Sequence, residues 1–455
     1  MTGYFTITSK TEMRPSPTMS AANMAKDAEA RGKKVDLVTI GDLFPKPAQD
    51  ETARWLNRLR QEAANPANAK DDMYVTLRSG EKLYAYSETT GVPSLRAAAA
   101  HTFSRDTGCA ATAAEVMIGV GGKGALNGAF FNSVKSGDVV LMAVPCWPSN
   151  FDMFPPGSIL VEIPTKDGIL RAADLKAALK AYPNPRMVLI NAPSNPTGSN
   201  YTPDEREEFF AAIAAETKDT IVASDDPYGK LIFDREPYDI TKVLQRGPHE
   251  KKLFTEGREA VFRTVSKEYG LAGERVGFVV TKNKEMLRSL QLWNENKGGG
   301  MGVENQILAQ AALLYGDEFI AGAVALLKEK RQLLMDGVAK MKTATMEPPR
   351  GTIYGWVDFA GLKGKQVPAD ISETGEAYSI ATPADMMRYL VNVVGVCPVP
   401  GVPFYAPGSP SGKDDWHARV TFCGPMEQLK RVIANLQSFE GKLTDSSTGS
   451  SRRAG

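Results

Sequence analysis

The sequence has few of the residues that metal sites and disulfide frameworks require. Its 455 residues include only four cysteines and three histidines. The cysteines are scattered, with no C-x-x-C pair among Cys109, Cys146, Cys397 and Cys423. This scarcity argues against a zinc site and against a disulfide framework. We therefore expect no bound metal.

The sequence also lacks an excess of charge of either sign and a long apolar run. Lysine and arginine number 54 against 53 aspartates and glutamates, which leaves a net charge of +1. No basic stripe indicates nucleic acid, and no polybasic segment indicates a membrane surface. No apolar run approaches about 18 residues, and the first residues lack the pattern of a signal peptide. We expect a cytoplasmic protein without nucleic-acid or membrane partners, long enough for two domains.

Strand and helix patterns alternate through the middle of the chain. Apolar runs predict strands at residues 115–120, 139–144, 187–191 and 221–223. Helices are predicted at residues 94–105 and after Thr202, which has the sequence of a capping box. Alternating βα units with apolar strands predict an α/β fold with a parallel sheet covered on both faces. Ligands of such sheets bind outside the carboxyl ends of the strands.

The two ends of the chain are expected to form a second, smaller domain. Residues 1–49 read as an irregular arm to residue 15, then a helix and a strand that join the small domain. Residues 50–300 form the large domain and 301–443 the rest of the small one, entered by a long helix near 303–341. Late strands at 353–359 and 419–422 should build its sheet. The Ser/Thr/Gly-rich residues 444–455 read as a disordered tail.

One lysine stands out because it follows a predicted buried strand. Lys267 comes after the apolar run 260–262, and Arg275 precedes the next apolar run. Burial lowers the pKa of a lysine and makes its neutral amine available as a nucleophile or base, as a Schiff-base lysine requires. Arginine is suited to holding a phosphate in two places. The alternative is a surface lysine and a structural arginine in a glycine-rich turn.

Four other loops at strand ends carry residues that are suited to binding a ligand or to catalysis. Residues 121–124 (GGKG) join a strand to a helix, which suits an anion but also an ordinary tight turn. Trp147 could stack on a flat ring or pack in the core. Asn195 can present an amide from a rigid, proline-containing loop. Asp225 directly follows a strand, where a buried acid is costly unless it meets a cation.

Together these loops resemble the class I/II aminotransferases, which are pyridoxal-phosphate enzymes of fold type I. Six motifs occur in family order within about residues 14–443: Tyr86 with Gly91 and Leu95-Arg96, Asn195–Gly198 (N-P-T-G), Asp225–Tyr228 (the D-E-x-Y site), Ser266-Lys267 with Arg275–Gly277 (S-K…R-x-G), Pro400–Phe404 (P-G-x-x-F) and Arg419–Phe422. Each motif alone is weak, but independent motifs in one order reinforce each other. The resemblance implies a large domain with a mainly parallel sheet flanked by helices, a smaller α+β domain, and pyridoxal 5'-phosphate as cofactor.

The resemblance also assigns the catalytic roles. Lys267 would bind the cofactor as a Schiff base and later move the proton between the substrate Cα and the cofactor. Asp225 would pair with the pyridine nitrogen and keep it protonated, which makes the ring an electron sink. Tyr228 and Asn195 would donate hydrogen bonds to the hydroxyl oxygen of the ring.

Binding roles follow in the same way. The phosphate would be held by Arg275, the hydroxyls of Thr264 and Ser266, the amides near Gly122 and Lys123, and Tyr86 of the neighbouring subunit in a homodimer. The substrate site would include Trp147 on the ring, Gly41 beside the substrate, Asn195, and Arg419 as a clamp for the α-carboxylate. For Trp147 and Gly41, core packing and a turn remain the alternatives.

The sequence departs from the family pattern in the loop before Tyr228 and in the segment expected to line the substrate pocket. Asp226-Pro227 replaces the usual glutamate and aliphatic residue before Tyr228. Residues 296–302 lack the arginine that binds a second carboxylate in dicarboxylate-specific relatives, and Lys297 is the only cation nearby. We therefore do not expect a strict aspartate aminotransferase. Glycines in this segment favour a larger or uncharged side chain.

Three classes of function remain open. The resemblance favours an aminotransferase, with an amino acid and a 2-oxo acid as substrates. The alternative is a pyridoxal-phosphate enzyme for elimination, replacement or ring formation on an amino acid such as S-adenosylmethionine. The third class is a regulator with an aminotransferase-like domain behind a DNA-binding one. It is disfavoured because only about 30 residues precede the predicted core and no basic patch exists.

Overall fold

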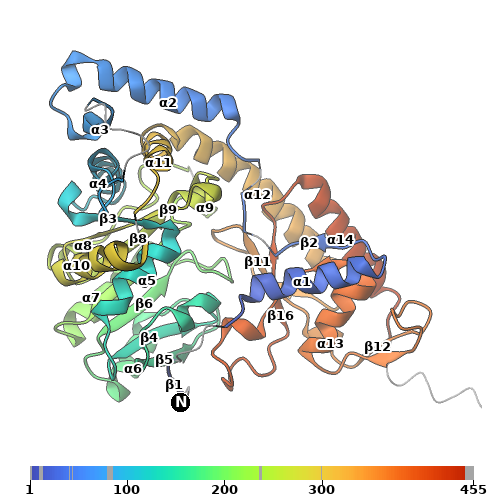
Figure 1. Cartoon of the computed structure of the whole chain (residues 1–455). Coiled ribbons are helices and arrows are strands. Elements are labelled where there is room, and N and C mark those ends of the chain that lie inside the picture. The colour runs from blue at the N-terminus through green and yellow to red at the C-terminus, as the bar shows by residue number, and fades with distance from the viewer. Residues whose placement is uncertain are drawn as a thin grey trace, which may run out of the picture.

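The helix α12 (Asp317–Ala339) joins two groups of helices and strands in this protein (Figure 1). One group is built on a large sheet, and the other combines the C-terminal elements with α1 (Pro17–Ala30). The computed structural model describes residues 3–9, 14–39, 41–43, 45–78, 86–234, 238–298 and 300–445, with the side chain of Arg78 left out.

Eight described strands form the large sheet. Their spatial order is β1 (Phe5–Thr8), β5 (Ile159–Pro164), β4 (Val139–Val144), β6 (Met187–Asn191), β7 (Ile221–Asp225), β8 (Glu259–Thr264), β9 (Val276–Thr281) and β3 (Val116–Val120). The strands from β5 to β8 run parallel, while β1, β9 and β3 pair antiparallel at the two edges. The predicted α/β fold with a mainly parallel sheet is therefore confirmed.

Helices cover both faces of this sheet because its strands bury side chains on both sides. Val140 and Met142 of β4 belong to the cluster with α5 (Gly121–Ser133) and α10 (Lys284–Trp293). The intervening Leu141 and Ala143 belong to the cluster with α6 (Ala172–Ala181) and α7 (Pro203–Glu216). This alternation is the period of two that a strand imposes. Further helices in this group are α2 (Gln49–Ala64), α3 (Val75–Arg78), α4 (Pro93–Thr107), α8 (Pro248–Thr255), α9 (Val265–Glu268) and α11 (Val303–Tyr315).

The second group contains the two late strands that the sequence predicted. β11 (Tyr354–Asp358) and β16 (His417–Thr421) pair antiparallel, with Arg419 opposite Trp356. β10 (Thr345–Met346) and β15 (Val399–Pro400) complete this sheet. The group also contains the helices α13 (Pro383–Arg388) and α14 (Met426–Glu440). One small sheet consists of β13 (Tyr378–Ser379), β12 (Lys365–Val367) and β17 (Thr444–Asp445). A second consists of β14 (Val396–Cys397) and β2 (Asp36–Leu37).

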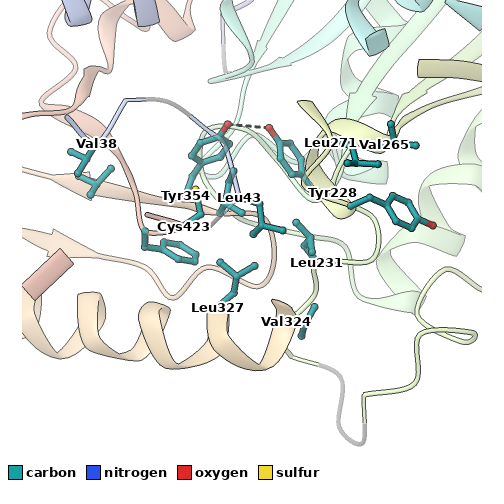
Figure 2. Packing of buried hydrophobic residues seen from close by; sticks show 14 of the residues in the cluster. Val38, Leu43, Tyr228, Leu231, Val265, Leu271, Val324, Leu327, Tyr354 and Cys423 are labelled. Carbon is teal, nitrogen blue, oxygen red and sulfur yellow. Dashed lines mark hydrogen bonds between the residues drawn. The ribbon is translucent and has the colours of Figure 1, made fainter. Parts of the chain in front are cut away.

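One hydrophobic cluster connects the two groups. Val324 and Leu327 of α12 pack there with Leu43 of the N-terminal segment and with Leu231 and Cys423 (Figure 2). Because its members come from both groups, this cluster holds the second group of elements against the first.

The predicted long helix at 303–341 is two helices. α11 and α12 meet at Gly316 with a bend of 74°. A Cβ at Gly316 would lie 2.8 Å from a ring carbon of Tyr269, so a side chain at this position would displace that buried ring. Among the described helices, none is by itself long and apolar enough to cross a membrane, and α11 and α12 reach that length and composition only as a bent pair.

The N-terminal segment divides between the two groups, which corrects the prediction of an irregular arm. Phe5–Thr8 form β1, which pairs with β5 at the edge of the large sheet. α1 lies instead with the C-terminal elements, and β2 pairs with β14. The expected tail also begins later than predicted, because Thr444 and Asp445 form β17; residues 446–455 lie outside the described part of the chain.

Candidate active site

One cavity of about 550 Å³ brings together every predicted site residue except Tyr86. It opens at the carboxyl ends of β6, β7 and β8, where Asn191, Asp225 and Thr264 are the last strand residues. Its lining consists of Ser16, Thr18, Met19, Gly41, Gly122, Lys123, Leu126, Trp147, Ser149, Asn191, Asn195, Asp225, Pro227, Tyr228, Thr264, Ser266, Lys267, Ala272, Arg275, Tyr354 and Arg419. The site therefore lies where a parallel sheet binds its ligands.

Lys267 enters this cavity from α9, a single helical turn directly after β8. Thr264 caps the turn, and its hydroxyl accepts the N–H of Ser266 at 3.1 Å. The half-buried Lys267 donates a hydrogen bond from Nζ to the carbonyl oxygen of Gly41. The structure thus brings this lysine into the cavity and not to the outer surface, the alternative that the sequence left open.

Asp225 is a buried acid at the cavity wall that lacks a cation. Burial, and next the neighbouring Asp226, raise the pKa of Asp225 to about 7. Its nearest donor is the Nδ2 amide of Asn191, which lies 2.8 Å from the backbone oxygen and 3.5 Å from a carboxylate oxygen of Asp225. No ion pair among the described residues includes it. A protonated nitrogen in the cavity would supply the missing cation.

The start of α5 and Arg275 form a cradle for an anion. α5 begins at Gly121, whose φ of +67° suits glycine, and a Cβ there would overlap the guanidinium of Arg275. Arg275 is itself in the left-handed region, with φ of +55°, and donates from Nη1 to the carbonyl of Ala272 at 3.0 Å. A helix N-terminus beside a guanidinium attracts negative charge. The hydroxyls of Thr264 and Ser266 line the same cavity.

Arg419 lines the same cavity and is held there by several contacts. The residue is buried, and its guanidinium donates to Oδ1 of Asn195 and to the carbonyl of Thr39, both at 2.8 Å. The guanidinium carbon lies 4.2 Å from the ring centroid of Tyr354. Nε of Arg419 has no hydrogen-bond partner within the described chain. A fixed guanidinium with an unpaired donor suits a carboxylate in the cavity.

Two residues of the cavity lining, Trp147 and Lys123, contact each other through an indole ring and an ammonium group. Trp147 is half-buried, and Nζ of Lys123 lies 5.3 Å from the centroid of its ring. The pKa of Lys123 is lowered, chiefly because its ammonium is partly desolvated, although Asp152 opposes this shift. Trp147 therefore lines the cavity and also contacts the core cluster on the α5 side, so both interpretations of this residue hold.

Tyr86 and the glycine-rich segment lie outside the cavity of their own chain. Tyr86 is 100% exposed, and neither Lys297 nor any other described residue of 296–302 lines the cavity. Lys297 is exposed in a π-helix at Asn294–Gly298 that follows α10. Of the two lysines Lys123 and Lys297, only Lys123 lines the cavity, and the sequence had predicted a role for its backbone amide alone.

Several residues of the lining were not predicted from the sequence. Tyr354 belongs to no sequence motif, and it lines the cavity only because the fold brings β11 beside it. Ser16, Thr18 and Met19, at the start of α1, reach the cavity from the N-terminal segment. Asn191 had a detectable signal, because it is a polar residue at the end of a predicted buried strand, as Asp225 is.

These residues fit pyridoxal phosphate. A buried acid without a cation suits the protonated ring nitrogen, and the cradle at α5 suits the phosphate. A lysine within the same cavity can bind the aldehyde carbon. Three features far apart in sequence thus match three parts of one cofactor.

Comparison with known proteins agrees with this fit. Residues 53–436 match the family described as aminotransferase class I and II. An aspartate/prephenate aminotransferase of Cereibacter sphaeroides is 26% identical over 433 residues, which cover 94% of this chain and 96% of that protein. A probable aspartate/prephenate aminotransferase of Rhizobium leguminosarum is 25% identical over 94% of this chain and 97% of its own length. The crystal structure of an aspartate aminotransferase from Rhizobium meliloti has the same fold, with a TM-score of 0.77 and 21% identity over 95% of this chain and 98% of that one.

These matches decide between the classes of function that the sequence left open. They agree with the predicted fold type I and do not favour elimination, replacement or ring formation. Because the family match spans well over half of its length, the chain belongs to the class I and II aminotransferases, and it is a pyridoxal-phosphate-dependent aminotransferase that acts on amino acids.

Proposed function

We propose that this enzyme transfers the amino group of an acidic amino acid of the aspartate type to a 2-oxo acid. The observation that carries this proposal is that Lys123 lines the cavity, with its ammonium 5.3 Å from the ring centroid of Trp147, which lines the cavity too. Relatives with 26% and 25% identity bear the name aspartate/prephenate aminotransferase, which supports the same substrate class.

The assignment of Lys123 follows from the other cations of the cavity. The described basic residues in the lining are Lys123, Lys267, Arg275 and Arg419. Arg275 would bind the phosphate, Lys267 the cofactor, and Arg419 the α-carboxylate of the substrate. Lys123 then remains for a second carboxylate, and this role replaces the earlier preference for an uncharged side chain, which counted Lys297 as the only nearby cation.

The residues of the chain divide the work of catalysis. When bound, pyridoxal phosphate supplies the electron sink that stabilises negative charge at the substrate Cα. The Nζ amine of Lys267 removes and returns the proton at Cα, and the carbonyl of Gly41 positions that amine. The carboxylate of Asp225 would hold a proton on the ring nitrogen, and the hydroxyl of Tyr228 and the amide of Asn195 would donate to the ring oxygen, since all three residues line the cavity.

Other residues bind and orient the two ligands. Arg419 would grip the α-carboxylate with two parallel hydrogen bonds, and Trp147 would stack on the cofactor ring. The amides at Gly122 and Lys123 and the hydroxyls of Thr264 and Ser266 would join Arg275 around the phosphate.

We also propose that the enzyme is a homodimer in which Tyr86 donates to the phosphate of the partner's site. The full exposure of Tyr86 in the single chain supports this arrangement, since a large aromatic side chain gains from burial at an interface.

The test compares an acidic and a neutral amino acid in two variants. Lys123→Met should lower kcat/KM for aspartate about 10- to 100-fold, the worth of one charge-assisted hydrogen bond, and leave alanine nearly unchanged. Arg419→Lys should lower kcat/KM for both substrates, because lysine cannot reproduce the bidentate contact. Lys297→Met is the matched control and should change neither. A wild-type preference for neutral amino acids, or equal losses for both substrates in Lys123→Met, would contradict the proposal.

A further inference from the structure

Tyr354 contacts two active-site groups with two parts of one side chain. It is the first residue of β11, is 3% exposed and lines the cavity. Its hydroxyl lies 3.1 Å from the hydroxyl of Tyr228, the contact drawn as a dashed line in Figure 2. Its ring lies beneath the guanidinium of Arg419, 4.2 Å from the guanidinium carbon. The strand register explains this contact, because Arg419 pairs with Trp356 and Tyr354 lies two residues away on the same face.

The position of the Tyr354 hydroxyl depends on Gly41. A Cβ at position 41 would overlap the Tyr354 oxygen, so a residue without a side chain is needed there. The carbonyl of the same glycine accepts the hydrogen bond from Lys267. Gly41 is therefore required by close approach, and it links the Tyr354 hydroxyl to the position of the catalytic lysine.

The turn before β11 holds Tyr354 through an unusual backbone conformation. Thr352 is buried and has a φ of +68°, which β-branched residues rarely adopt. Its hydroxyl accepts the N–H of Tyr354 at 3.2 Å, and its own N–H donates to the carbonyl of Leu231 at 2.9 Å. Leu231 belongs to the loop that carries Tyr228, so the turn ties the two tyrosines together. Strained residues of this kind cluster at functional sites.

The direction of the bond between the phenols follows from their hydrogens. Each phenol has one hydrogen to donate. If Tyr228 donates its hydrogen to the ring oxygen of the cofactor, the hydrogen between the two phenols must come from Tyr354. Donors in such a chain polarise one another, so the bond from Tyr354 strengthens Tyr228 as a donor.

We propose that Tyr354 is a positioning residue that serves both halves of the site: its hydroxyl orients the Tyr228 phenol toward the cofactor, and its ring holds Arg419 for the substrate carboxylate. The inference rests on the proposed role of Tyr228. The charged and titratable groups around the Tyr228 phenol are Tyr354, Arg419 and Asp225, and Lys267 lines the same cavity. Each belongs to a different element, so their effects can be separated by substitution.

The hydroxyl is tested by a pH titration of the visible absorption of the cofactor-loaded enzyme without substrate. A donor to the ring oxygen lowers the proton affinity of the bound cofactor, so Tyr228→Phe should raise the titration midpoint. Tyr354→Phe keeps the ring and should raise the midpoint by roughly 0.1 to 0.7 pH unit, which corresponds to 10–30% of a charged hydrogen bond. The shift should vanish when Tyr354→Phe is added to Tyr228→Phe. Gly41→Ala crowds the same hydroxyl and gives a second route to the same shift.

The contact between the Tyr354 ring and Arg419 is tested by measuring KM for the amino acid substrate. Tyr354→Leu should raise KM for the amino acid about 2- to 30-fold, the range of a cation–π contact, whereas Tyr354→Phe should not. The inference about Tyr354 is wrong if Tyr228→Phe moves the midpoint and Tyr354→Phe does not. It is also wrong if Tyr354→Phe shifts the midpoint equally in the wild type and in the Tyr228→Phe variant. If Tyr228→Phe itself leaves the midpoint unchanged, the proposed role of Tyr228 fails, and the inference falls with it.

Discussion

The protonation of Asp225, and its effect on the stability of the folded protein, depend on whether the cofactor is bound. The carboxyl of Asp225 is buried at the cavity wall, and Asp226, whose own pKa burial raises to about 6, is the next residue. An acid whose pKa is higher in the folded than in the unfolded protein binds an extra proton on folding. The folded state therefore loses stability as pH rises from about 4, the unfolded pKa, through 7. A cationic ring nitrogen removes this cost.

Asp225→Asn should accordingly stabilise the cofactor-free protein at pH 8 by about 2–4 kcal/mol, because asparagine carries no charge to bury. Urea unfolding at pH 8 and at pH 4 measures the effect, which should disappear at the lower pH. Asp219→Asn, at an exposed position, is the matched control and should be neutral. Equal stability of Asp225→Asn and wild type at pH 8 would show that this carboxyl is not destabilising. The cofactor-loaded variant should lose activity, since nothing then holds the ring proton.

At the scale of elements, the anion cradle depends on how closely β9 approaches the start of α5. A Cβ at Gly277 of β9 would lie 2.7 Å from Cα of Gly122 and would overlap the peptide bond between Gly121 and Gly122. Backbone atoms cannot move aside as a flexible side chain can. The strand and the helix are therefore in direct backbone contact at the point where the phosphate is expected to bind.

Gly277→Ala should push the first turn of α5 out of place. We expect a loss of stability of about 1–3 kcal/mol, the usual cost of overpacking, together with weaker cofactor binding. Titration of the purified variant with pyridoxal phosphate, followed by absorbance, measures the affinity. The control Gly273→Ala lies in the 3-10 turn just before β9, with nothing within 4 Å of its Cβ, and should behave as wild type. Unchanged cofactor affinity in Gly277→Ala would mean that the cradle tolerates this displacement.

At the scale of the whole molecule, a buried charge network connects the two groups of elements. Nζ of Lys230 lies 2.9 Å from Asp106 of α4 and 3.0 Å from Asp317 in the first turn of α12. Arg263 joins Asp106 to Glu268, the residue after the catalytic lysine. Although burial alone would raise it, Lys230 and the neighbouring arginines hold the pKa of Asp106 below its usual value. Asp106 thus contributes stability above its unfolded pKa and loses that contribution as pH falls through its lower folded pKa.

Lys230→Met should destabilise the protein by about 3–5 kcal/mol at pH 7, because it removes a fully buried cation from the buried carboxylate of Asp106. The difference from wild type should shrink toward pH 3, where Asp106 can become protonated. Thermal unfolding at both pH values measures this. Lys242→Met removes an exposed ion pair with Asp239 and should cost less than about 1 kcal/mol. Similar losses in the two variants would contradict the importance of burial.

Local patterns in the sequence determined much of the fold and part of the site. β4 and β6 have the predicted bounds, and Thr202 caps α7 through the predicted capping box, because apolar periodicity and caps act within a few residues. Lys267 and Asp225 were identifiable because each follows a predicted buried strand, where a charged side chain is costly unless it has a partner or a function. The motif order then indicated the family, which the comparisons confirmed.

Tertiary structure alone decided the features that depend on residues far apart in sequence. The partner of Tyr228 is Tyr354, 126 residues away, and no local signal marks such a pair. The cavity cation is Lys123 and not Lys297, because the direction of a side chain depends on the packing of its helix. Likewise β1 gains its strand conformation only from pairing with β5, and the helix after residue 303 bends at Gly316 where Tyr269 packs. The sequence by itself determined which chemistry this protein performs, through short-range rules, whereas the long-range contacts of the folded chain decided how its side chains are positioned for it.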